Sequence, residues 1–366
     1  MRKIFKELHL WLSLPLGIVM AVTCFSGAML IFEKEITESI QKEYYFVDKV
    51  SDDALSFSQI IEKVQPTLDK GVEITGIVVS NDPERCYKLN LSKPNRAAVY
   101  VDQYSGELKG QPERLAFFRT MFRLHRWLMD SRPADGGIFW GKMIVGVSTL
   151  LMVIVLITGI VIWIPKNIKG LKNRLSIKVG NGWRRFWYDL HVAGGIYAVL
   201  LLLAMALTGL TWSFEWYRNG FYKVFGVEMT KNNGNNSNKQ KTQVEDEQKT
   251  PYLHWEEVYK KLSMENPESK QITISKGSAT VSVDAFGNKR ASDKYKFDNA
   301  SGEIISKELY SDAAKSSKIR GVIYSVHVGN WGGMITRVLW FLAAMIGAAL
   351  PLTGYYLFFK RKFGKK

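Results

Sequence analysis

The stretch LHLWLSLPLGIVMAVTCFSGAMLIFE at residues 8–33 returns in altered form as LHVAGGIYAVLLLLAMALTGLTWSFE at residues 190–215. In both stretches a glycine that follows a hydroxyl residue stands eighteen positions after the histidine. Eighteen residues make about five turns of an α-helix, so the histidine and the glycine lie on one helix face. The two pairs are His9 with Gly27 and His191 with Gly209. Each stretch therefore predicts an apolar helix with an imidazole near one end and bare backbone near the other.

Long apolar blocks indicate a membrane protein. Each holds about twenty or more mostly apolar residues, which is enough for a helix to cross about 30 Å of hydrocarbon. A buried core helix of that length would be unusual in a soluble domain. We therefore expect four transmembrane helices, in the blocks 10–32, 138–164, 191–214 and 335–359.

The net charge of +16 reports topology rather than nucleic-acid binding. The two ends of the chain and the segment 165–190 together hold fifteen Lys and Arg residues against Glu7 and Asp189. The long segments nearly balance, with 15 basic and 17 acidic residues in 33–137, and 18 and 15 in 215–334. Because cytoplasmic segments collect Lys and Arg, we expect both termini and the 165–190 loop inside the cell, both long loops outside, and no nucleic-acid partner.

The first apolar block also resembles a secretory signal peptide. Arg2 and Lys3 precede it, and Ser26-Gly27-Ala28 resembles a cleavage site. The apolar run is too long for a typical signal peptide, however, and its copy at 190–215 cannot be one. We therefore expect an uncleaved membrane helix.

Cysteine use argues against disulfides and covalent haem. Cys24 falls in the first expected span and Cys86 in the first long loop, so the two are not expected to pair. The sequence contains no C-x-x-C-H, which excludes c-type haem attachment.

Each long loop predicts a small α+β module, at 53–110 and at 251–308. Expected in the first are a helix at 53–69 and strands at 74–79, 87–91 and 97–101. Expected in the second are a helix at 255–262 and strands at 271–275, 279–285 and 294–297. Both end in the turn D-x-x-S-G-E, at 102–107 and 298–303, and the polar stretch 231–250 predicts a flexible insertion.

The chain therefore reads as a tandem duplication. The remaining expected parts are transmembrane helices at 1–36 and 191–216, histidine-bearing segments with their helices at 113–164 and 318–360, and a basic cytoplasmic loop at 165–190.

This order of parts resembles the PepSY-associated transmembrane helix family. The resemblance covers nearly the whole chain, from the N-terminal Leu-His segment through both D-x-x-S-G-E turns to the last span. It implies an α-helical membrane protein of four transmembrane helices in two tandem repeats, with two periplasmic α+β PepSY-like modules. It also implies a multi-pass protein of the bacterial inner membrane linked to iron uptake, since some family members are di-haem reductases of ferric siderophores.

Four of the five histidines occupy matched positions in the two repeats. His9 and His191 begin helices at the inner face, whereas His125 and His327 precede helices at the outer face. About 30 Å of hydrocarbon separates the faces, so a metal can be shared by His9 with His191, or by His125 with His327. Four interfacial histidines satisfied by their neighbours are the weaker alternative. His254 has no counterpart and is expected at the surface.

Two imidazoles per pair, apolar walls and no matched carboxylate favour bis-histidine haem b over zinc, which takes four ligands in structural sites. We therefore predict two haems b per chain, one iron between His9 and His191 and one between His125 and His327. The matched glycines fit this arrangement, because glycine lets a planar ring approach the backbone, although helix packing explains each one almost as well. The glycines expected beside the outer pair are Gly27 and Gly209, and those beside the inner pair are Gly159 and Gly354. Candidate propionate partners are Arg184, Arg185, Arg126 and Arg337.

The prediction is a transmembrane haem-dependent oxidoreductase, with membrane lipid around it and a ferric siderophore or similar chelate as outer partner. The sequence shows no nicotinamide or flavin motif, so the electrons are expected from quinol or a cytoplasmic reductase. No catalytic residue is identified. The alternative is a non-enzymatic membrane protein whose modules bind or inhibit peptidases or sense the envelope. A two-repeat transporter ranks last, because the spans hold almost no ionisable residues in their middles.

Overall fold

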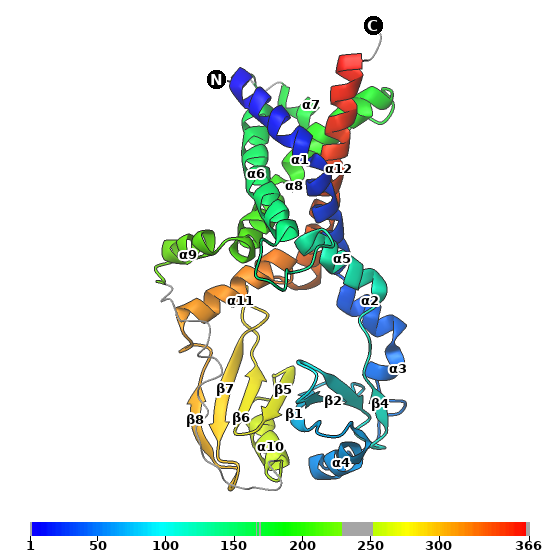
Figure 1. Cartoon of the computed structure of the whole chain (residues 1–366), viewed down its shortest axis with the longest axis vertical. Helices are drawn as coiled ribbons and strands as arrows, with labels where there is room; N and C mark the ends of the chain where they lie inside the picture. The colour runs from blue at the N-terminus through cyan, green and yellow to red at the C-terminus, as the bar shows by residue number, and fades with distance from the viewer. Residues whose placement is uncertain (1, 166, 168–169, 229–251, 364–366) are drawn as a thin grey trace. The chain divides into compact units, whose positions relative to one another are not determined.

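The computed structural model describes residues 2–165, 167, 170–228 and 252–363, and the chain divides into two compact units (Figure 1). Unit 1 comprises Met1–Glu33, Leu115–Glu228 and Val322–Lys366. Unit 2 comprises Lys34–Arg114 and Met229–Gly321. The expected insertion at 231–250 lies outside the described residues.

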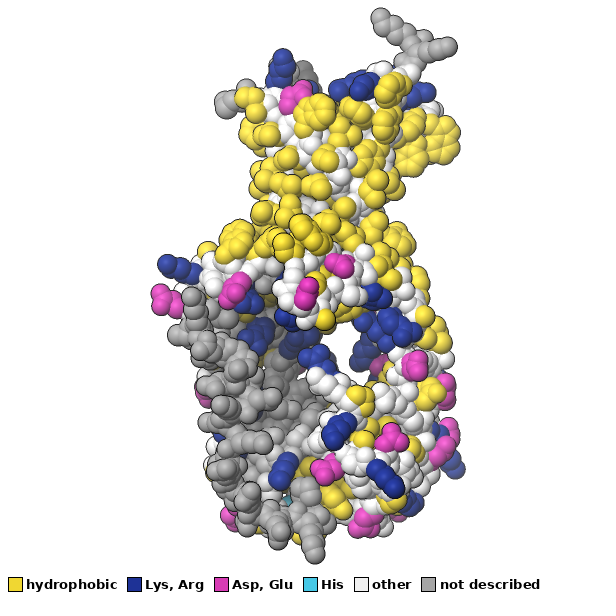
Figure 2. Space-filling model, in the orientation of Figure 1, with side chains coloured by type: hydrophobic (Ala, Val, Ile, Leu, Met, Phe, Trp, Pro, Cys, Tyr) yellow, Lys and Arg dark blue, Asp and Glu magenta, His cyan; other side chains and the backbone are white. Residues whose placement is uncertain are grey.

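Unit 1 is built on long apolar helices. Among the described residues, four helices are long and apolar enough to cross a membrane: α1 (Arg2–Leu30), α6 (Trp140–Trp163), α8 (Trp183–Ser213) and α12 (Gly333–Phe363). Figure 2 shows hydrophobic side chains over the surface of these helices, and Lys and Arg side chains gathered at one end. The four expected spans are confirmed, and α8 begins inside the expected 165–190 loop, which also holds α7 (Leu171–Leu175).

The four long helices form one bundle, in which α1 and α8 each pack against both α6 and α12. Its centre is made of Leu156, Ala198, Val199, Leu202 and Ala343, all at least nine-tenths buried. Small residues at such crossings let helix backbones approach closely. α1 and α8 end, and α6 and α12 begin, at one end of the bundle, hereafter the outer end; both chain termini lie at the other, inner end (Figure 1).

Shorter helices flank the spans. α2 (Glu33–Ile40) and α3 (Lys42–Tyr45) follow α1, and α9 (Glu215–Val224) follows α8. α5 (Ala116–Trp127) precedes α6, and α11 (Lys315–Val328) precedes α12. The two helices that precede spans carry His125 and His327, so the second histidine of each repeat lies on its own short helix, outside the long apolar helices.

Unit 2 contains an antiparallel sheet of eight strands within the described residues, in the order β4-β3-β2-β1-β5-β6-β7-β8. The strands of the first half are β1 (Ile74–Ser80), β2 (Tyr87–Leu91), β3 (Ala98–Val101) and β4 (Leu108–Gly110). Those of the second half are β5 (Gln271–Ser275), β6 (Ser278–Ser282), β7 (Ser292–Phe297) and β8 (Ile304–Glu308). The last strand of each half was not predicted, because both are short or largely exposed and lack a clear alternating pattern.

The expected fold class, an α-helical membrane protein carrying two separate α+β modules, is wrong. β1 pairs with β5 from Gly76 opposite Ser275 to Ser80 opposite Gln271, so both halves share one sheet. The physical reason is that each half alone would leave the unpaired N–H and C=O groups of β1 or β5 on an exposed edge, and pairing satisfies both edges. Local sequence patterns predict strands but not the partner of a distant edge.

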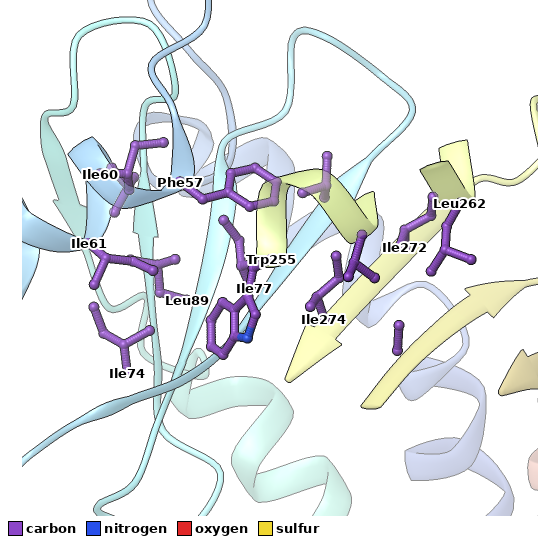
Figure 3. Close-up of a cluster of buried hydrophobic side chains, with 14 of the residues drawn as sticks. Phe57, Ile60, Ile61, Ile74, Ile77, Leu89, Trp255, Leu262, Ile272 and Ile274 are labelled. Carbon is purple, nitrogen blue, oxygen red and sulfur yellow. The ribbon is translucent and has the colours of Figure 1, made fainter. Parts of the chain in front are cut away.

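The two halves also share one hydrophobic core (Figure 3). α4 (Phe57–Val64), its 3-10 extension η1 (Gln65–Thr67) and α10 (Trp255–Glu265) supply the helical side of unit 2. Trp255 of the second half is 1% exposed and lies in the same cluster as Ile77 and Leu89 of the first. The Phe57 amide donates to Glu256, joining α4 to α10. The core therefore crosses the junction between the two halves of the sheet.

Local chemistry explains the ends of these elements. The Ser56 side chain and the Gln59 side chain form a reciprocal capping box that starts α4. In both D-x-x-S-G-E turns the first and last residues close a backbone hydrogen bond, from Asp102 to Glu107 at 3.0 Å and from Asp298 to Glu303 at 2.9 Å. The equivalence of the two turns, predicted from sequence, is confirmed.

Candidate haem-ligand sites

The inner pair of histidines comes together at the inner end of unit 1. His9 lies near the start of α1 and His191 near the start of α8, and their ring centres are 6.3 Å apart. The ring planes are almost perpendicular, at 89°. The structure thus places side by side two residues that lie far apart in the sequence and that the duplication matches.

The outer pair comes together at the other end. His125 on α5 and His327 on α11 have ring centres 6.0 Å apart and planes inclined at 50°. Trp212, in the last turn of α8, packs its ring edge-on at 5.0 Å from the His327 ring. Unit 1 therefore holds two histidine pairs, one at each end, and each pair joins equivalent residues of the two repeats.

One nitrogen of each ring is held by a neighbouring helix. His9 Nδ1 lies 3.0 Å from the Val155 carbonyl of α6, and His125 Nδ1 lies 2.8 Å from the Thr23 carbonyl of α1. His327 Nδ1 lies 3.0 Å from the Met205 carbonyl of α8. At His191 the anchor is the Thr353 hydroxyl of α12, whose oxygen lies 2.8 Å from Nδ1. The three carbonyl anchors each stand four residues before a predicted glycine.

The predicted glycines make room for these rings. A Cβ added to Gly27 would lie 2.7 Å from His125 Cε1, and one added to Gly209 would lie 3.1 Å from His327 Cε1. At the inner pair, the corresponding distances are 3.3 Å from Gly159 to His9 and 3.5 Å from Gly354 to His191. The planar ring that lies on each glycine is therefore the imidazole of its own repeat.

Threonine hydroxyls fix the proton on three of the rings. Thr158, Thr208 and Thr353 stand directly before the glycines, and each hydroxyl lies 2.8 to 3.2 Å from the Nδ1 of a histidine. Each hydroxyl also donates its hydrogen to a carbonyl one turn back in its own helix. The oxygen can then only accept from the ring, so Nδ1 carries the hydrogen and Nε2 keeps its lone pair. Ser26, the fourth such residue, bonds Val22 and Thr23 but does not reach His125.

The outer pair is kept uncharged. Burial lowers the pKa of His125 below its ordinary value, and the nearby positive charge of Arg126 adds to the effect. Burial lowers the pKa of His327 to about 4, with a further contribution from His125. A neutral imidazole has the free lone pair that a metal ligand needs.

These residues fit a bis-histidine haem. Within the described part of the chain, no hydrogen bond reaches Nε2 of any of the four rings, although each is at least partly buried. Two in-line metal–nitrogen bonds of about 2 Å, plus roughly 1 Å from nitrogen to centre in each ring, give a separation of about 6 Å. The described residues contain no group of three or more His, Cys, Asp or Glu side chains suited to a metal, which disfavours a structural zinc site.

The predicted propionate partners have other contacts. Arg185 pairs with the buried carboxylate of Asp189 at 2.9 Å. Arg337 donates to the Ile31 carbonyl and lies over the Phe32 ring. Separately, Arg126 lies over the Phe122 and Trp127 rings, and Arg184 is exposed. The fifth histidine, His254, was expected at the surface; it lies in unit 2, partly exposed, with Nδ1 3.1 Å from Glu257.

Sequence reasoning missed the anchoring groups. The three carbonyls belong to Thr23, Val155 and Met205 and act through the backbone, so residue type gives no signal for them. The visible trace is the hydroxyl-glycine dipeptide, which recurs at 26–27, 158–159, 208–209 and 353–354. A metal-bound histidine commonly donates its other nitrogen to a carbonyl or similar group, which fixes its orientation.

The family model described as PepSY-associated TM region matches residues 6–361, so this chain belongs to the PepSY-associated transmembrane family. A search of curated proteins finds no match.

Proposed function

We propose that this membrane protein carries electrons across the bacterial inner membrane to a ferric siderophore or similar chelate in the periplasm. It would hold two haems b, one between His9 and His191 and one between His125 and His327. The cation-rich inner end of unit 1, with both termini, would face the cytoplasm. Unit 2 would lie in the periplasm.

One observation carries the proposal. In each of the four histidines, Nδ1 is hydrogen-bonded to a group of its own repeat, and no hydrogen bond within the described residues reaches Nε2. A neutral imidazole nitrogen with a free lone pair is what a metal ligand needs. At both ends the rings are about 6 Å apart, centre to centre, a spacing at which both rings of a pair would reach one metal. Family membership supports the membrane setting.

The residues of the chain have defined tasks in this scheme. The histidines would hold the two irons, and the glycines and carbonyls keep the rings in place. Held by these histidines, a haem would supply one-electron transfer. The apolar centre of the bundle, around Leu156 and Leu202, excludes water between the two pairs.

The electron balance sets what the partners must do. Each ferric ion gains one electron and becomes ferrous, which weakens its hold on a chelator that prefers the ferric state. A two-electron donor at the inner end, such as a quinol, would serve two ferric ions and release two protons. A cytoplasmic reductase is the other class of donor.

The direct test is the absorption spectrum of the full-length protein, purified from cells supplied with haem. We expect a Soret band that shifts on reduction with dithionite, and two haems per chain. His9→Ala or His191→Ala should remove the inner haem alone, and His125→Ala or His327→Ala the outer haem alone. His254→Ala is the matched control and should retain both.

Function is then tested in sealed vesicles that contain a reductant and carry a ferric chelate outside. Ferrous iron should appear outside with the unaltered protein and the His254→Ala variant, and should fall to background when either pair is broken. A colourless protein would overturn the proposal. So would iron reduction that survives the loss of all four histidines, because the activity would then reside elsewhere.

A further inference from the structure

α9 leaves the bundle at the outer end of unit 1. Phe214 has an extended backbone, with φ −125° and ψ 129°, which ends α8 and turns the chain. α9 then runs across the direction of the long helices (Figure 1). Its sequence, EWYRNGFYKV, is followed by Phe225. A helix in this position lies where a span meets the membrane surface.

The helix has an apolar side and a polar side. At about 100° per residue, Trp216, Tyr217, Phe221 and Val224 fall on one side. Glu215, Asn219 and Lys223 fall on the other. Trp216 is 63% exposed and Val224 is 83% exposed. This is the amphipathic pattern of a helix that covers an apolar surface.

Much of the apolar side is exposed. Tyr222, which is 3% exposed, is the buried residue of the helix. On the helical wheel Val224 lies roughly opposite Tyr222, about 160° away. The rings of Tyr217, Phe221 and Phe225 follow one another with centres 6.1 and 5.2 Å apart, giving a continuous aromatic strip. Phe225 is exposed, as are Trp216 and Val224 beside the strip, whereas Tyr217 and Phe221 are half-buried.

We propose that α9 is an interfacial membrane helix, whose aromatic side lies in the headgroup layer of the leaflet at the outer end of unit 1. Helices of this kind carry Trp and Phe on one side and basic residues on the other, and lie in the plane of the membrane. α9 has the basic residues Arg218 and Lys223 at the borders of its apolar side.

The level of α9 along the bundle favours lipid as the occupant. Trp212, in the last turn of α8, is 41% exposed and is of the residue type that marks the membrane–water boundary. Glu215 follows three residues later, about 5 Å along a helix, and the interfacial layer on each side of the hydrocarbon is of about that thickness. α9 therefore starts within this layer.

The aromatic side of α9 has no counterpart in α2, the matched helix of the first repeat. The helix at the matched position in the first repeat, α2, reads EKEITESI and contains no aromatic residue. α9 would thus hold the second repeat at the membrane surface just beside Trp212, whose ring contacts His327 of the outer pair. The inference does not depend on haem.

The test measures where each side of α9 lies in a bilayer. Single cysteines are placed at Val224→Cys on the apolar side and Glu215→Cys on the polar side, in full-length protein carrying Cys24→Ala and Cys86→Ala. Each is labelled with a polarity-sensitive fluorophore and placed in nanodiscs of phosphatidylcholine and phosphatidylglycerol. Met264→Cys on α10, where the native side chain is 80% exposed, is the reference for water.

We expect the label at Val224→Cys to emit at shorter wavelength, and to be quenched several-fold more by lipids brominated near the headgroup than the label at Glu215→Cys. Equal quenching by aqueous iodide at Val224→Cys and Met264→Cys would overturn the proposal. Protection from both quenchers, with crosslinking between copies through Val224→Cys, would also overturn it and identify a second copy as the occupant.

Discussion

Replacing Gly27 with alanine should displace His125 and damage the outer site. The new Cβ would lie 2.7 Å from His125 Cε1, whereas ordinary contacts begin at about 3.4 Å. The ring must therefore retreat by the difference, about 0.7 Å. The Nδ1 bond to the Thr23 carbonyl, 2.8 Å in the native protein, then lengthens to about 3.5 Å, the limit for a hydrogen bond.

The cost follows from these displacements. A lost hydrogen bond costs about 0.5–1.5 kcal/mol, and an overpacked side chain about 1–3 kcal/mol, so Gly27→Ala should cost roughly 3 kcal/mol at this site. Gly354→Ala is the matched control, because its Cβ would meet His191 at an ordinary 3.5 Å. Alanine also favours a helix over glycine by up to about 1 kcal/mol. The difference, about 3 kcal/mol, is more than a hundred-fold in an equilibrium constant.

The assay is the haem content per chain after gel filtration, together with thermal unfolding. Gly27→Ala should lose the outer haem and unfold at a lower temperature, whereas Gly354→Ala should keep two haems and unfold at the native midpoint or slightly above it. Gly209→Ala and Gly159→Ala should fall between them, in that order, because their contacts are 3.1 and 3.3 Å. If Gly27→Ala and Gly354→Ala behave alike in both measurements, the glycines do not seat the rings.

Further changes test the hydroxyls, the shared sheet and the buried thiol. Thr208→Val removes a hydroxyl acceptor from His327, which weakens the ligand and should raise the outer haem potential in a redox titration; Ser26→Ala, whose hydroxyl does not touch His125, should leave it unchanged. Thr273→Pro in the central strand β5 should lower the free energy of unfolding of unit 2 by about 3 kcal/mol or more. Ile305→Pro in the edge strand β8 should lower it much less. Equal losses would contradict the shared sheet. Burial raises the pKa of Cys86 to about 12, so at neutral pH its neutral thiol should resist alkylation, measured by mass spectrometry, until the protein unfolds; rapid labelling of native protein would count against that burial.

The sequence predicts the parts of this protein that depend on local pattern and on the duplication. The four spans follow from apolar length, and the pairing of His9 with His191 follows from their matched positions and from topology. The structure brings these two rings together. That they bind haem stays a prediction.

What the sequence does not predict depends on backbone contacts between distant segments. The joint between β1 and β5 pairs Val78 with Thr273, and neither side chain indicates its partner. The sequence likewise does not indicate which carbonyls hold the histidines, since Val155 and Met205 act through their backbones. The contact between Gly27 and the His125 imidazole was not predicted for the same reason, because only the packed helices determine the position of that ring.

The duplication supplies partners that a single repeat would lack, both for the histidines of unit 1 and for the strand edges of unit 2. Every histidine is anchored within its own repeat, as His125 is on α1 and His327 on α8, yet each forms its pair only with the histidine of the other repeat. A single repeat would therefore hold its two histidines in place, each with a free nitrogen, but neither would have the matching histidine of the other repeat beside it. In unit 2 a single half would likewise end in an unpaired strand edge, at β1 or at β5. Joining two copies in one chain completes the ligand pairs in unit 1 and, separately, the sheet in unit 2, much as a dimer joins two like subunits. This is why either half of the protein alone should hold neither haem.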